Sequence, residues 1–151
     1  MRNYRAAVTV HSRIKPFNHC NHDSWYYTYR VSSLQLGQNM NTKNMLPEAA
    51  MFELVDDLIS MGIKTVVFSG GGELILCKPL SVVVERLTKG GVKVASLTNG
   101  SNLKGKIAAV FAAYGKWVRV SVDGWDDASY ATAQKIKDGS FTTLSQNIRN
   151  F

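Results

Sequence analysis

The side chains best suited to chemistry lie between positions 19 and 27. His19, Cys20, His22 and Asp23 carry imidazole, thiol and carboxylate groups, which are the ligands that proteins use for zinc and related metals. Neighbouring positions in one loop rarely point at a common centre, so a solvated loop explains these four residues more simply than a zinc site does. Cys77 has no recognisable spacing with Cys20, and we expect both cysteines to be reduced thiols.

Aromatic residues follow in the same segment: Trp25, Tyr26, Tyr27 and Tyr29, beside Arg30. Their rings could stack on nucleic-acid bases, but packing of the loop against the rest of the domain is the alternative use. The formal net charge of +7 would also favour an anionic partner. The basic residues are scattered along the chain without a run, which is typical of a solvated surface. A basic nucleic-acid-binding module therefore stays an alternative, and nucleic acid is not the partner that we expect.

Three further polar segments each follow a short apolar run. They are Ser69-Gly70-Gly71-Gly72-Glu73, Thr98-Asn99-Gly100 and Ser121-Val122-Asp123-Gly124. Taken singly, each is ordinary turn chemistry, because glycine permits positive φ angles. Glu73 and Asp123 are the acids in these segments, and an acid and base pair could be imagined from them. No histidine in these segments supports that pairing.

Apolar periodicity supplies the elements that must position these segments. It predicts a helix over 47–62, a strand over 65–68, a helix over 80–89, a strand over 92–97, a helix over 103–114 and a strand over 117–122. Residues 6–10 are the predicted first strand, and helices are predicted over 128–135 and 141–151. Strands separated by single helices form right-handed βαβ units and a parallel sheet of about four strands with helices on the outside. In such a sheet the polar segments meet at the carboxyl ends of the strands, where ligands bind.

These segments together resemble the radical S-adenosylmethionine (radical SAM) superfamily. That family carries Cys-x3-Cys-x2-Cys after its first strand, with an aromatic residue before the last cysteine. Here the frame reads Cys20-Asn21-His22-Asp23-Ser24-Trp25-Tyr26-Tyr27, so that Ser24 and Tyr27 replace two of the three cysteines. Gly71-Gly72-Glu73 is similar to the family's Gly-Gly-Glu motif, although Leu74 stands where proline commonly follows. Residues 98–100 and 121–124 resemble segments that line SAM in many members.

The resemblance implies a fold, a cofactor and a site. The fold is an α/β partial (βα) barrel, in which the chain forms one partial core domain over 1–151 without the last two βα units of the family. The three cysteines of the family hold three irons of a 4Fe-4S cluster, and the fourth iron chelates SAM. The SAM positions carried over are Tyr26, Gly71, Gly72, Glu73, Thr98, Asn99, Ser121 and Asp123, and Cys20 is the remaining metal-ligand position.

The incomplete cysteine frame predicts that the cluster chemistry of the family is lost. One thiolate does not replace three, because serine is a poor iron ligand and tyrosine is bulky and differently directed. We therefore expect no stable 4Fe-4S cluster, a degenerate domain that does not generate the 5'-deoxyadenosyl radical, and residual binding of SAM or a related nucleotide. The alternative is a fragment or ligand variant of a true radical SAM enzyme acting on a peptide or small metabolite. An unpaired edge strand also predicts self-association or a second chain that completes the barrel.

Composition limits the remaining classes of protein. Hydrophobic residues make up 45% of the 151 positions and charged residues 19%, which suits one globular core. No stretch approaches the roughly 18 uninterrupted apolar residues of a membrane helix, and the first residues lack the apolar run of a signal peptide. A cytoplasmic protein without a membrane partner is the resulting expectation.

Overall fold

The computed structural model describes residues 10–27 and 40–151, which form a four-stranded parallel sheet and its helices. The elements are β1 (His11–Ile14), α2 (Glu48–Ser60), β2 (Thr65–Phe68), the 3-10 helix η1 (Leu74–Leu76), α3 (Leu80–Lys89), β3 (Lys93–Thr98), α4 (Gly105–Tyr114), β4 (Gly115–Val120), α5 (Asp127–Gln134) and α6 (Ser140–Arg149). None of the helices in the described ranges is long and apolar enough to cross a membrane.

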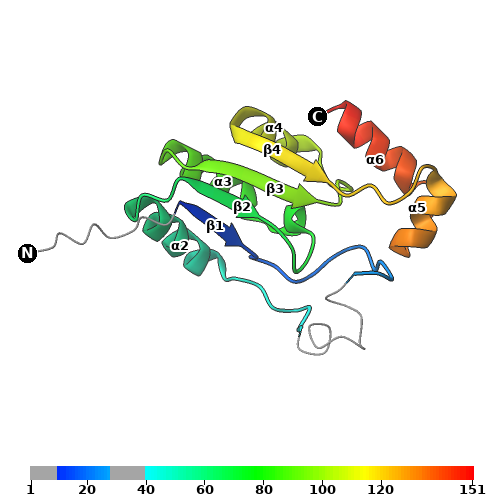
Figure 1. Ribbon diagram of the computed structural model, residues 1–151, viewed down its shortest axis with the longest axis horizontal. Coiled ribbons are helices and arrows are strands. Elements are labelled where there is room, and N and C mark those ends of the chain that lie inside the picture. The colour runs from blue at the N-terminus through cyan, green and yellow to red at the C-terminus, as the bar shows by residue number, and fades with distance from the viewer. Residues whose placement is uncertain (1–9, 28–39) are drawn as a thin grey trace, which may run out of the picture.

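The strands lie in chain order, β1-β2-β3-β4, and each neighbouring pair is parallel. Helix α3 packs against both α2 and α4, so the three connecting helices form one layer along the sheet (Figure 1). The carboxyl ends of all four strands point toward α5 and α6 (Figure 1). This arrangement confirms the predicted α/β class, with four parallel strands and helices on one side.

The core lies between the sheet and the helix layer. Val66, Phe68 and Val94 on the strands and Val83 and Val84 on α3 have no solvent-accessible surface. Each such side chain contributes about 1.5–3 kcal/mol by leaving water. In β2 the consecutive residues Val66, Val67 and Phe68 are all buried, so this strand is covered on both faces of the sheet.

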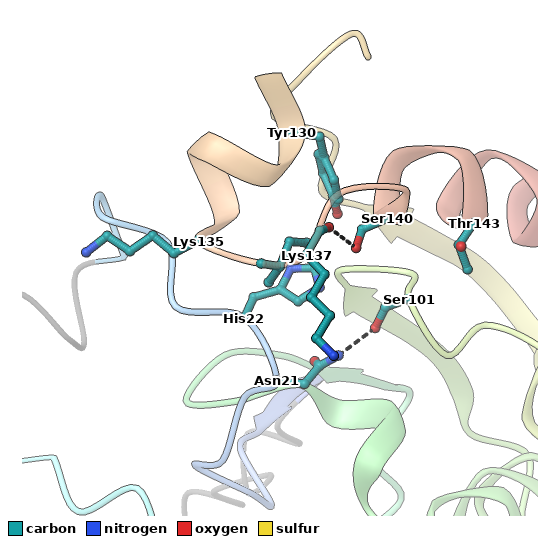
Figure 2. A pocket seen from close by; sticks show the side chains of 9 residues that line it. Asn21, His22, Ser101, Tyr130, Lys135, Lys137, Ser140 and Thr143 are labelled. Atoms are coloured by element: carbon teal, nitrogen blue, oxygen red, sulfur yellow. Dashed lines mark hydrogen bonds between the residues drawn. The ribbon is translucent and has the colours of Figure 1, made fainter. Parts of the chain in front are cut away.

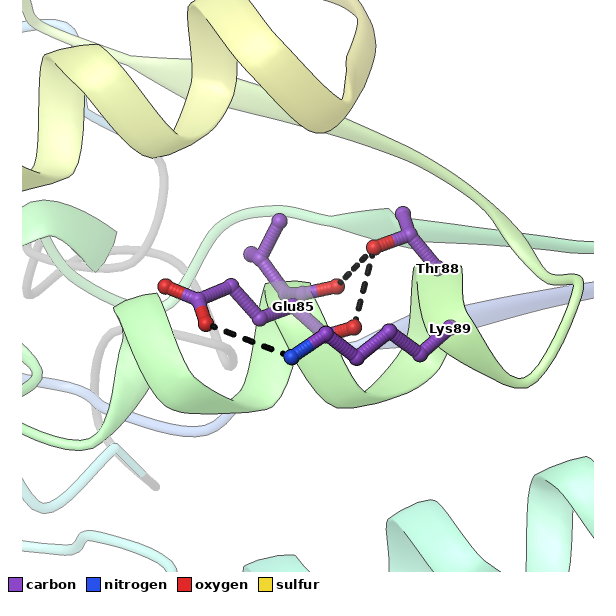
Figure 3. Close-up of polar contacts among 4 residues, drawn as sticks. Glu85, Thr88 and Lys89 are labelled. Carbon is purple, nitrogen blue, oxygen red and sulfur yellow. Dashed lines mark hydrogen bonds and ion pairs between the residues drawn. The ribbon is translucent and has the colours of Figure 1, made fainter.

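Helix α3 shows why its sequence forms a helix with one buried side. Its outer face carries polar groups that satisfy one another: Lys89 Nζ lies 4.0 Å from Glu85 Oε2, and Thr88 Oγ1 donates to the carbonyl of Val84 at 2.8 Å (Figure 3). Arg86 and Lys89 stand in the last turn, where positive charge complements the helix dipole. The stripe of apolar residues is therefore free to face the sheet.

The first strand differs from the prediction. The predicted strand over 6–10 lies outside the described residues except for Val10, which is not in a strand. The observed β1 is His11–Ile14, and it pairs residue by residue with Thr65–Phe68 of β2. Only Ile14 of these four residues is buried, so β1 is an edge strand whose polar sequence gives no apolar signal. Its position is set by pairing with β2.

The fourth strand also begins and ends two residues earlier than predicted. Helix α4 ends at Tyr114 and β4 begins at Gly115, with no loop between them. The register of the β3 and β4 pair shifts between Val94 and Ala95, so that Trp117 stands opposite Ala95. Residue Ser121 follows the strand but still donates its N–H to the carbonyl of Thr98 at 2.9 Å. The predicted bounds of 117–122 were therefore wrong by two residues at each end. Apolar periodicity does not show where a helix ends when a strand follows it without a loop.

Candidate functional site

A cavity of about 190 Å³ opens at the carboxyl ends of the strands. Its lining residues are Cys20, His22, Ser24, Tyr26, Tyr27, Gly70, Gly72, Glu73, Leu97, Thr98, Asn99, Ser121, Asp123 and Gln134. The three positions of the cysteine frame and seven of the eight predicted SAM positions are in this set. The eighth, Gly71, does not line the cavity, but its N–H donates to the Tyr27 hydroxyl at 3.3 Å. The structure thus brings the predicted residues to one place, and what they bind stays a prediction.

Gly72 and Glu73 hold the loop after β2 against the loop after β1. The Glu73 N–H donates to the carbonyl of His19 at 2.8 Å. A Cβ on Gly72 would lie only 2.0 Å from that same oxygen, so only glycine allows the two backbones to approach this closely. Gly71 has a φ of 113°, which also favours glycine. The close approach of the two loops therefore explains why glycines stand before Glu73, independently of the resemblance to the family's motif.

The Glu73 carboxylate is a buried anchor. Its side chain is 2% exposed, and its Oε1 accepts from Thr98 Oγ1 at 2.5 Å and from the Ile75 N–H at 3.1 Å. Oε2 accepts from the Asn99 N–H at 2.7 Å. Burial raises the pKa of Glu73, and the three donors only partly oppose that shift. The carboxylate thereby fixes the end of β3 to the end of β2.

Asn99 connects the same strand end to the cysteine frame. Its Nδ2 donates to Asn21 Oδ1 at 2.9 Å and lies 3.9 Å from Cys20 Sγ. Its Oδ1 accepts from Ser101 Oγ at 2.7 Å. The Cys20 thiol is thus held next to an amide that is itself fixed by two other side chains.

Gln134, at the end of α5, is a residue of this cavity that sequence reasoning missed. Its Oε1 accepts a short hydrogen bond from Ser24 Oγ and lies 3.3 Å from His22 Nδ1. Its Nε2 donates to the Tyr26 hydroxyl at 2.6 Å and to Asp123 Oδ2 at 2.8 Å. One amide therefore joins α5, the cysteine frame and the segment after β4. The available signal was its spacing of four from Tyr130, which places both on the same buried face of the predicted helix.

Two titratable groups that contact Gln134, Tyr26 and His22, have pKa shifts that favour their neutral forms. Burial, with a smaller contribution from the hydrogen bond to Asp123, raises the pKa of Tyr26 to about 12. Burial lowers the pKa of His22, against the opposing effect of its contact with Gln134. At neutral pH this part of the cavity therefore presents a phenol and an uncharged imidazole beside the Asp123 carboxylate.

The donor atoms present do not match the ligand set of a 4Fe-4S cluster, which is held by thiolates. Cys20 supplies one thiol, while the Ser24 hydroxyl donates to Gln134 and the Tyr27 hydroxyl accepts from Gly71. Within the described ranges no three His, Cys, Asp or Glu side chains are placed to share one metal ion, and His19, Cys20, His22 and Asp23 do not form such a group. Glu73 bonds to the end of β3 and Asp123 to Gln134, and an acid and base pair of these two residues stays an untested idea.

The Gln134 bonds predict a loss of stability when the amide is removed. Gln134→Ala is expected to lower the free energy of unfolding by about 2 kcal/mol, because Ser24, Tyr26 and Asp123 lose their partner in a partly buried site. Urea unfolding followed by circular dichroism measures this change. Gln146→Ala, which removes an exposed amide from α6, is the matched control and should change stability by less than about 0.5 kcal/mol. Equal losses in the two variants would contradict the role given to Gln134.

Comparison with known proteins now bears on this geometry. The family model of the radical SAM superfamily matches residues 14–151. An S-adenosylmethionine-dependent nucleotide dehydratase of Lacinutrix mariniflava (strain JCM 13824 / KCCM 42306 / AKS432) is 32% identical over 94 residues, which are 62% of this chain. The chain spans only 20% of the length of that relative.

Solved structures share the fold at low sequence identity. BtrN in complex with AdoMet and 2-DOIA has a TM-score of 0.62 and 22% identity, and the match covers 78% of this chain and 47% of BtrN. Streptococcus suis SuiB bound to its precursor peptide SuiA has a TM-score of 0.69 and 13% identity, over 94% of this chain and 30% of SuiB. These matches agree with the partial barrel, and the match to the family model over nearly all of the described sheet shows that the chain belongs to the radical SAM superfamily.

Proposed function

We propose that this chain is a degenerate radical SAM domain of the cytoplasm, which binds SAM or a related nucleotide but does not assemble the cluster of its family. One observation carries the proposal: the carried-over SAM positions surround one cavity, whereas two of the three cluster positions are hydroxyls. Ser24 is bonded to Gln134 and Tyr27 to Gly71, so both hydroxyls already have protein partners. No radical step is assigned to these residues.

In this proposal the chain's own residues hold the ligand. Ser121 and Asp123 are exposed on the open side of the cavity, where a hydroxyl and a carboxylate suit the hydroxyls of a ribose. Thr98 and Asn99 are buried at the bottom and are fixed by Glu73. Glu73 brings its carboxyl oxygens, which are acceptors, to this cavity, and these favour the amino group of SAM. Without an iron to chelate the methionine part, affinity rests on these contacts alone.

SAM binding is measured by isothermal titration calorimetry. We expect the parent chain to bind SAM and Glu73→Gln to bind about tenfold more weakly, because one hydrogen-bonded charge is lost. Glu53→Gln removes an exposed carboxylate from α2 and is expected to leave SAM binding unchanged. Circular dichroism establishes that each variant is folded. Absence of any binding heat at millimolar SAM in the parent would refute residual cofactor binding.

Restoring the cysteine frame tests the proposed loss of the cluster. After anaerobic reconstitution, the double variant Ser24→Cys and Tyr27→Cys is expected to gain cluster iron and a reduced-cluster EPR signal, because three thiolates again stand in the family's frame. The parent is expected to show little iron. The matched variant Ser24→Ala and Tyr27→Phe removes the same hydroxyls without adding thiols. Near-stoichiometric cluster iron in the parent would overturn this part of the proposal.

We also propose that the chain associates with itself or with a second chain along β4. Within the described part of the chain β4 pairs only with β3, and Trp117 on this strand is 48% exposed. An unpaired strand with an exposed aromatic side chain is a ready partner for another strand. Size-exclusion chromatography with light scattering is expected to give a mass above that of one 16.7 kDa chain, and Trp117→Lys is expected to lower it. A monomeric parent at all concentrations argues against association.

A second candidate function has its own support. The matches cover 20% of the dehydratase, 47% of BtrN and 30% of SuiB, so these 151 residues correspond to part of larger radical SAM proteins. In this reading the chain acts within a longer enzyme that modifies a peptide or a small metabolite such as a nucleotide. An in-frame extension with further βα units in the source genome would favour it, and flanking stop codons on both sides would remove it.

A further inference from the structure

A second pocket lies on the other side of His22, which lines both it and the cavity at the strand ends. Its volume is about 390 Å³. It is formed by the loop after β1, the loop after β3, the end of α5 and the start of α6 (Figure 2). The lining residues are Asn21, His22, Ser101, Tyr130, Lys135, Ile136, Lys137, Ser140 and Thr143. A pocket of this size holds a small ligand rather than a single water.

Tyr130 supplies the observation that points to a ligand. Its side chain is 1% exposed, and its hydroxyl has no hydrogen-bond partner among the described residues. The ring makes an edge contact with His22, at 6.0 Å between centroids, and a tilted contact with Phe141 at 5.9 Å. Figure 2 shows the hydroxyl end turned into the pocket. A buried hydroxyl without a partner is costly, so a group that accepts its hydrogen bond is expected in this space.

The hydroxyl of Tyr130 is available as a donor. Burial, followed by the nearby negative charge of Asp123, raises the pKa of Tyr130 to about 12. The group therefore stays protonated at neutral pH and donates its hydrogen to an acceptor. An anion, whose oxygens only accept, is a better partner for it than a neutral group.

The charged side chains that line the pocket itself are lysines, which suit an anionic ligand, and Asp123 lines the neighbouring cavity instead. No carboxylate lines it, and Lys137 is one of the side chains that line it (Figure 2). Within the described ranges no ion pair occupies Lys137. The Lys135 side chain points away from the pocket in the same view, so it supplies no charge to a ligand there. The backbone N–H groups at the start of α6 are not proposed as donors to the ligand, because the Thr142 N–H already donates to Asp127 at 2.9 Å.

We propose that this pocket binds the phosphate group of a phosphorylated small ligand. Lys137 supplies the charge and the Tyr130 hydroxyl supplies one hydrogen bond. Asn21 supplies a second from the amide hydrogen that remains, since its Nδ2 already donates to Ser101 Oγ at 2.9 Å. A tetrahedral phosphate offers acceptor oxygens in directions outside one plane, whereas the acceptor sites of a carboxylate lie close to a single plane. The site stands on its own geometry, and its position next to the other cavity places a bound phosphate ligand beside the proposed SAM site.

Inorganic phosphate is the probe, titrated at constant ionic strength into ¹⁵N-labelled full chain and followed by NMR. We expect shifts of amides around the pocket, with Lys137→Ala weakening binding about tenfold. Lys89→Ala is the matched control. It removes the same charge from the end of α3, where Lys89 lies beside Glu85 (Figure 3). This end of α3 lies at the opposite end of the sheet from α5 and α6 (Figure 1). Equal weakening by both lysine variants, or shifts confined to other parts of the chain, would overturn the site.

Tyr130→Phe separates ligand binding from folding. The variant keeps the packed ring and removes only the unpartnered hydroxyl, so the free protein is expected to be at least as stable as the parent. Phosphate affinity is expected to fall about fivefold or more, since one charge-assisted hydrogen bond is lost. Unchanged phosphate affinity would overturn the proposal. SAM calorimetry reads the neighbouring cavity, so a failure of SAM binding and a failure of phosphate binding are told apart.

Discussion

The carbonyl oxygen of His19 is the point on which this site depends. Glu73 donates its N–H to that oxygen, and Gly72 passes so close to it that any Cβ would overlap. This contact joins the loop after β1 to the loop after β2, and the Glu73 carboxylate continues the connection to the end of β3. A backbone contact across loops that follow neighbouring strands therefore shapes the cavity before any cofactor is considered. The sequence Gly-Gly-Glu meets both needs, a close approach and a buried acceptor.

The second organising group is the amide of Gln134, which has both a donor and an acceptor side. A carboxylate at this position would only accept and an ammonium would only donate, so neither could serve Ser24 and Asp123 at once. Burial, and not the amide, raises the pKa of Tyr26 and lowers that of His22, because the hydrogen bonds with Gln134 oppose both shifts. In family members with three cysteines, metal bonds fix this loop. Here hydrogen bonds from α5 hold its described part.

Most of the fold was readable from the sequence, and the exceptions have physical reasons. The helices α2, α3 and α4 and the strands β2 and β3 follow apolar periodicity, because each faces the core. Strand β1 is polar and is fixed by pairing, and β4 leaves α4 without a loop, so neither boundary has a local signal. The residues around the cavity were predicted from strand ends and family motifs. Gln134 and Tyr130 were missed, because their importance comes from contacts made after α5 folds back.

The bond between Ser24 and Gln134 spans 110 positions of the chain. During synthesis on the ribosome the segment around Ser24 emerges early, but its partner emerges only when α5 has been made. The parallel sheet already requires pairing between strands that are far apart in the sequence. The bond between Ser24 and Gln134 forms later than that pairing, because it needs α5. The conformation of residues 20–27 therefore depends on helix α5. The ribosome must have synthesised residue 134 before the loop after β1 can adopt its final conformation.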